Sequence, residues 1–230
     1  MNRSIRRKLT MATRVRDFNR AHPDGGEGHT LMLALLEDRL TRAEALATQQ
    51  RSGYLAVRSA ATRKLELRRT IREEHLEHLA RIGRAAGTEQ PELAKRFQLP
   101  RQNVDSQTFL ASARASAAEA AAQKAIFVRD GMPETFLEDL AKALSEYEAA
   151  GNELNAGMAL HIGARADLEA VAAEIMQIVK RLDGINRYRF RGDAELKAAW
   201  KSAQDVAWPL AGGEEHAPAP GGDVVQPTAS

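Results

Sequence analysis

Apolar residues recur at steps of three and four along most of the chain, a spacing that predicts amphipathic helices. One such stretch runs from about Thr30 to Ala86 without a proline, and a second runs from about Pro133 to Leu182. At 1.5 Å per residue the first would form a helix roughly 80 Å long. Each predicted apolar stripe is expected to face the core. These stripes include Leu36, Leu40, Tyr54, Val57, Ala61 and Leu65 in the first helix, and Leu140, Leu144, Met158, Ile162 and Leu168 in the second.

Shorter helices precede and follow the two long ones. The same spacing predicts a helix over about 4–22, ending at a Pro-Asp-Gly-Gly turn, and another that Asp105 or Ser106 can cap and that ends before Gly131. Asp193 can cap a last helix that ends near Val206. We therefore expect an all-α fold. It would be an elongated antiparallel helical bundle, with about four main helices in short-long-short-long order and a short C-terminal helix.

Charge, proline and glycine divide the chain further. We expect a basic helical hairpin at 1–87, a connector at 88–105 with a short helical turn near its prolines, and an acidic hairpin at 106–184 packed on the first as one bundle. Residues 185–207 would form an arginine and aromatic link followed by a short helix. Residues 208–230 are rich in Pro, Gly, Ala and acidic residues, a composition that predicts a disordered tail.

The two long helices also align with each other at an offset of 104 residues. Positions Leu33, Leu36, Leu40, Glu44, Ala45, Gly53, Ala60 and Ile71 match Leu137, Leu140, Leu144, Glu148, Ala149, Gly157, Ala164 and Ile175. This match suggests two duplicated helical hairpins. The alternative is that any two leucine-rich helices align in some register, and the short helices show no sequence match at this offset.

Composition excludes several functions. Among the 230 residues there is no cysteine, which excludes disulfides, thiolate metal sites and a cysteine nucleophile. Aromatic residues make up only 5%, so the core is expected to be mostly aliphatic. The N-terminus lacks the apolar segment of a secretion signal, and no stretch approaches the roughly 18 apolar residues of a membrane span. We expect a cytoplasmic protein without membrane association.

The formal net charge of +2 conceals an asymmetry between the two halves. Up to Val104 there are 21 Lys plus Arg against 12 Asp plus Glu, and the remainder holds 12 against 19. A basic half suits an acidic partner such as nucleic acid. Alternatively, the basic half packs beside the acidic half of the same molecule.

Two groups of residues are candidates for binding a polyanion. Lys64, Arg68 and Arg72 fall on one helix face and would form a positive ridge that meets either phosphates or the acidic half. The segment Arg187, Tyr188, Arg189, Phe190 and Arg191 alternates arginine with aromatic residues, a pattern that can pair phosphates and stack bases of a single strand. The alternative for this segment is a connection whose two rings pack on the end of the bundle while the arginines face water.

Catalytic and metal-binding patterns are weak. Glu74, His75 and His78 have spacing that can hold a surface metal ion, but a solvated charged face explains them better. His161 lies beside the apolar stripe without an evident nucleophile or carboxylate partner. No cofactor is expected, and a metal-dependent enzyme is the third choice.

The tandem helical layout resembles that of PhoU-type phosphate regulators, which are duplicated three-helix bundles of similar length. This resemblance covers architecture alone, because the acidic metal motifs of that family have no counterpart at matching positions, and no residue role follows from it. The sequence favours a structural or protein-interaction module, without catalysis, that binds a protein partner or itself. Nucleic-acid or polyanion binding is the alternative.

Overall fold

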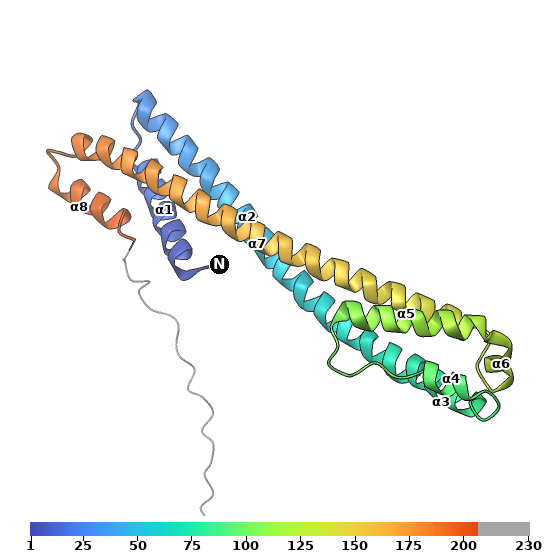
Figure 1. The fold of residues 1–230 in the computed structure, drawn as a ribbon. Helices are drawn as coiled ribbons and strands as arrows, with labels where there is room; N and C mark the ends of the chain where they lie inside the picture. The colour runs from blue at the N-terminus through green and yellow to red at the C-terminus, as the bar shows by residue number, and fades with distance from the viewer. Residues whose placement is uncertain (207–230) are drawn as a thin grey trace, which may run out of the picture. The chain divides into compact units, whose positions relative to one another are not determined.

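The computed structural model describes residues 1–206, and every regular element in that range is a helix (Figure 1). This confirms the all-α prediction, whereas the predicted tail at 208–230 lies outside the described residues. None of the described helices is long and apolar enough to span a membrane. The elements are α1 (Arg3–Ala21), α2 (Glu27–Thr70), a π-helical segment η1 (Ile71–Leu76), α3 (Glu77–Ala86), α4 (Pro91–Arg96), α5 (Ser106–Ala122), α6 (Lys124–Arg129), α7 (Phe136–Arg189) and α8 (Ala194–Ala203).

Side-chain caps begin three of the short helices. The Asp105 carboxylate accepts hydrogen bonds from the amides of Gln107 and Thr108, and Asp193 accepts one from the amide of Leu196. Both caps were predicted from the sequence. Such caps satisfy amides that have no partner inside the helix. A third cap, by Asn2, begins α1.

Several predicted helix boundaries differ from the structure, including the end of the last helix, which is at Ala203 and not Val206. The third helix is interrupted at Gln123, so that α5 and α6 replace a single element. The fourth begins at Phe136, after Pro133, and continues past the predicted end at Leu182. Residues 185–189 are therefore the last turns of α7 and not a link.

Contacts made by Asp183 explain why α7 does not end at the Asp183-Gly184 pair. One carboxylate oxygen of Asp183 pairs with Arg187 one turn later at 2.9 Å, and the other accepts the indole N–H of Trp200 at 2.9 Å. These partners hold the helical turn in place across the glycine. A contact with α8 therefore overrides the local stop signal.

The chain forms two compact units, and each combines segments from both halves of the sequence. Unit 1 comprises Thr41–Val171 together with Met1, and unit 2 comprises Asn2–Leu40 with Ala172–Ser230. Within unit 1, α2 and α7 run antiparallel, because Gly53 lies against His161 while Lys64, further along α2, lies against Gly151, earlier in α7.

Aromatic rings contribute more to the core of unit 1 than their low number suggests. Phe109 of α5 packs edge-on against Tyr147 of α7 at 5.6 Å between ring centres, and Phe97 packs on Phe127 at 4.7 Å. Leucines and isoleucines of η1, α3 and α7 complete this buried cluster. In Figure 1, α5 lies along α7 at this end of unit 1, and α4 lies beside α3.

Unit 2 combines an aromatic cluster with a buried polar network. Trp200 of α8 packs on Phe18 of α1 at 5.3 Å. Beside them the Asn19 side-chain oxygen accepts hydrogen bonds from His29 Nε2 at 2.9 Å and from the Asn186 amide at 2.8 Å. Burial lowers the pKa of His29, and nearby Arg189 adds to that effect, so the neutral imidazole is favoured.

The element order supports the suggested duplication. The first residues of α1 and α5, the last residues of α3 and α7, and the first residues of α4 and α8 are each 103 residues apart. The correspondence therefore includes the short helices, for which the sequence alone showed no match. Eleven position pairs 104 residues apart are buried at both members: Ile5/Phe109, Met32/Phe136, Leu36/Leu140, Leu40/Leu144, Ala43/Tyr147, Leu46/Ala150, Gly53/Gly157, Ala60/Ala164, Ile71/Ile175, Ile82/Asn186 and Ala86/Phe190.

Candidate interaction surface

The predicted basic ridge lies on one face of α2 and η1, where its arginines bind the connector. Arg68 donates to the carbonyl oxygens of Gln102 at 3.0 Å and Val104 at 2.6 Å, and Arg72 donates to that of Pro100 at 2.7 Å. Charge-assisted hydrogen bonds of this kind are stronger than neutral ones. These hydrogen bonds hold the connector against α2 and η1.

The remaining contacts of the ridge are with aromatic rings. The Arg68 guanidinium also lies 4.6 Å from the centre of the Phe109 ring, and the Lys64 ammonium lies 5.3 Å from that of Tyr147. All three ridge residues are only partly exposed. The structure thus brings the predicted ridge together and engages each member inside unit 1.

In unit 2 the segment 187–191 has a similar role. Arg189 is only 19% exposed and donates to the Asn186 side chain at 3.0 Å and to the carbonyl oxygens of His22 at 3.1 Å and Pro23 at 3.0 Å. Phe190 is buried. These contacts hold the loop between α1 and α2 to the end of α7.

The other members of the segment are more exposed. Arg187 pairs with Asp183, and Arg191 stacks on the Tyr188 ring at 4.1 Å. Tyr188 itself is 69% exposed. The expected docking of both rings therefore holds for Phe190 and not for Tyr188, and Arg189 does not face water.

Ion pairs join the basic half of the sequence to the acidic half within each unit. Arg39 pairs with Glu174 at 2.8 Å in unit 2, and Arg96 pairs with Glu119 in unit 1. These side chains are largely exposed, so each pair contributes little stability. Their arrangement accounts for part of the charge asymmetry without an external partner.

The histidines of residues 1–206 pack against aromatic rings or donate to backbone and side-chain oxygens. His75 and His78 each lie 5.2 Å from the ring of Phe136, and burial lowers the pKa of His75. His161 Nδ1 donates to the Gln50 carbonyl at 3.1 Å. Among the described residues there is no group of three or more potential ligands that could hold a metal ion.

Two glycines set the distance between α2 and α7 in the middle of unit 1. A Cβ added to Gly53 would lie 2.8 Å from the backbone nitrogen of His161, and one added to Gly157 would lie 3.1 Å from that of Val57. Both distances are shorter than ordinary van der Waals contact. The helices approach so closely here because neither position carries a side chain.

We call the line where α2 and α7 approach at Gly53 and Gly157 the close seam. The helix pair has one lateral side on each side of this seam. Arg63 lies on one side, near Glu146 at 3.7 Å and Glu153 at 3.8 Å. In heptad terms these three residues occupy the same flanking position. Tyr54 and Met158 occupy the opposite flanking position, and Arg51, Arg58, Leu65, Asn155 and Ile162 occupy the outer position next to it on the same side. We call this second side the bare face, and it comprises Arg51, Tyr54, Arg58 and Leu65 of α2 with Asn155, Met158 and Ile162 of α7.

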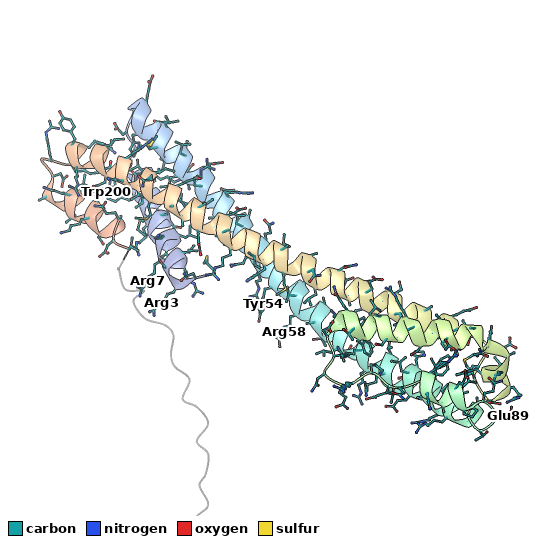
Figure 2. All side chains as sticks on the ribbon, viewed as in Figure 1. Arg3, Arg7, Tyr54, Arg58, Glu89 and Trp200 are labelled. Carbon is teal, nitrogen blue, oxygen red and sulfur yellow. The ribbon has the colours of Figure 1, made fainter. Side chains whose placement is uncertain are left out.

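All residues of the bare face are exposed. The exposed fraction is 52% for Tyr54, 70% for Leu65, 49% for Met158 and 63% for Ile162. Figure 2 shows Tyr54 and Arg58 extending outward from α2, at a point where no further helix of unit 1 lies. Single exposed apolar residues are ordinary, but several on one face are typical of a binding surface.

The apolar spacing did not reveal this surface, because all four apolar residues fall on the stripes that were expected to face the core. The stripe is wider than one close-packed partner can cover. Small residues, including Gly53, Ala60, Gly157 and Ala164, fill the buried seam, and the larger residues at its flank stay outside. The available signal was this segregation of small from large apolar positions.

Comparisons with protein families, curated proteins and solved structures found no match to this chain.

Proposed function

We propose that this protein is a non-catalytic, cytoplasmic protein-interaction module that binds its partner through the bare face of unit 1. The observation that supports it is the exposure of Tyr54, Leu65, Met158 and Ile162 together on one side of a closely packed helix pair. Burying apolar side chains of this size yields about 1.5–3 kcal/mol each when they are fully covered. A partner that covers even two of them therefore gains substantial affinity.

A photocrosslinking experiment in the native cells tests this function. A benzophenone amino acid replaces Tyr54 on the bare face in the full chain, and Ser59 carries it in the control. Ser59 is also exposed on α2 and lies about 140° around the helix from Tyr54, at 100° per residue. We expect a protein adduct at position 54 and none at position 59. Absence of any adduct at position 54, or equal adducts at both positions, would contradict the proposal.

Polyanion or nucleic-acid binding remains the alternative function, through Lys64, Arg68, Arg72 and the segment 187–191. It is less well supported, because Arg68, Arg72 and Arg189 already donate to backbone carbonyls. Filter binding of single-stranded DNA and RNA tests it directly, and retention should fall steeply between low and moderate salt. A metal-dependent enzyme is third, since no ligand cluster supports it within residues 1–206.

A further inference from the structure

The chemistry of the bare face indicates what kind of protein would cover it. The face contains two arginines, Arg51 and Arg58, which form no ion pair with any residue in the described part of the chain. None of its seven residues is a carboxylate, although Glu66 lines a surface depression with Arg58; Glu148, seven residues before Asn155, pairs with Arg114 of α5. The remaining members of the face are apolar side chains and Asn155. The surface is therefore both apolar and positively charged, and its best complement is apolar and negatively charged.

The neighbouring part of unit 1 shows what shape fits this side of the helix pair. There, α5 and the connector lie against the same flank of α2, where Arg68 stacks on Phe109 of α5. A helix can lie in the groove between two antiparallel helices and bury a stripe of its own apolar residues. From Arg51 to Leu65 the bare face extends for roughly 21 Å, which accommodates about four helical turns.

A second copy of this chain is a poorer complement. Face-to-face association would bring Arg51 and Arg58 of one copy against the same unpaired arginines of the other, and like charges in a desolvated contact cost several kcal/mol. Nucleic acid is also a poorer complement. Leu65, Met158 and Ile162 would have to be covered, and aliphatic side chains neither pair phosphates nor stack as aromatic rings do.

We infer that the bare face binds an acidic amphipathic helix of another protein, which places apolar residues over Tyr54, Met158 and Ile162 and carboxylates against Arg51 and Arg58. This inference rests on the proposed function and specifies its partner. The occupied site would reproduce the three-helix packing that α5 already provides at the next part of unit 1.

A binding titration with a designed peptide tests the inference. The probe is a fluorescent helical peptide of about 20 residues with leucine at helical spacing and glutamate on both flanks. A second peptide carries lysine at every glutamate position. With the full chain, we expect the glutamate peptide to bind at least about tenfold more tightly than the lysine peptide. Equal affinity for the two peptides would overturn the inference, since it would mean that charge plays no part.

Three variants locate the peptide on the protein. Ile162→Asp and Arg58→Glu should each weaken binding of the glutamate peptide by at least about tenfold. Lys142→Glu removes an exposed cation of α7 outside the bare face and should change binding by less than about twofold. Circular dichroism verifies that each variant keeps its helical content. Unchanged binding in Ile162→Asp overturns the inference.

Two further measurements identify other occupants. If light scattering shows a dimer of the wild-type chain that Ile162→Asp abolishes, the occupant is a second copy. If single-stranded DNA displaces the peptide and Arg58→Glu abolishes DNA binding, the occupant is a nucleic acid. Either result overturns the acidic-helix inference. Crosslinking at Tyr54 with no peptide binding would reject the acidic helix and retain the proposed interaction function, whereas failure of both would reject both.

Discussion

Unit 1 shows the same helix pair in two situations, covered in one part and bare in the next. In the covered part, Phe109 of α5 packs on Tyr147 while Arg68 donates to connector carbonyls. On the bare face, Tyr54 and Arg58 are likewise an aromatic residue and an arginine on adjacent turns of α2, and both are exposed. Residue types alone therefore do not assign a role. An arginine stabilises the fold where a third segment of the chain packs on the helix pair. Where no third segment packs, the arginine is available to a partner.

Removing the central aromatic residue of the covered part should have the largest effect. Phe109 is fully buried, so Phe109→Ala should lower the free energy of unfolding by about 3–5 kcal/mol, through lost apolar burial and the cavity left behind. Tyr54→Ala on the bare face should change it by less than about 0.5 kcal/mol. Urea denaturation followed by circular dichroism measures both. Similar losses in the two variants would mean that the bare face is covered in solution.

Alanine at the close seam should have the next largest effect. Gly53→Ala places a Cβ against the backbone of His161, so overpacking should cost about 1–3 kcal/mol despite the better helix propensity of alanine. Gly163→Ala is the matched control, because a Cβ there meets nothing within 4 Å. That control should gain about 0.5–1 kcal/mol. The same denaturation measurement compares them, and stabilisation by Gly53→Ala would show that the helices are further apart than described.

The two arginines provide a smaller contrast. Arg68→Ala removes two hydrogen bonds to the connector and a stacking contact with Phe109, which should cost about 1–2 kcal/mol. Arg58→Ala should cost less than about 0.5 kcal/mol, since its side chain has no partner within the described residues. Thermal or urea unfolding distinguishes them. An equal cost for both substitutions would remove the distinction between a structural and an available arginine.

Much of the fold follows from local patterns in the sequence. Apolar spacing predicts the order and type of the helices, and the caps at Asp105 and Asp193 lie where their side chains allow. These features depend on neighbouring residues within one or two turns. The Pro91–Arg96 turn was predicted for the same reason.

Other features depend on contacts between distant residues and could not be predicted in that way. α7 continues beyond Leu182 because Asp183 binds Trp200, and Arg189 is engaged by carbonyls at His22 and Pro23. The predicted stripes located the apolar residues but not the number of helices that cover them. The bare face was missed because burial at Tyr54 or Ile162 depends on a third layer, which periodicity does not report.

The smallest expected effect is a pH dependence of stability that comes from the covered part of unit 1 and not from the bare face. Burial lowers the pKa of His75 below its ordinary 6.5. The charges of Glu74 and Asp139 raise this pKa, and His78 lowers it further. Since the unfolded chain then binds a proton at higher pH than the folded chain, stability should fall as pH decreases below about 6.5 and level off below the folded pKa. The slope from one group cannot exceed about 1.4 kcal/mol per pH unit.

His75→Gln should flatten this part of the profile, while the buried His29 of unit 2 contributes equally to both proteins and cancels in their difference. Hydrogen exchange should show faster opening of α5 at acidic pH in the wild type than in His75→Gln, with no difference between the two proteins at 150–165. A profile unchanged by the substitution would mean that His75 titrates as it does in the unfolded chain.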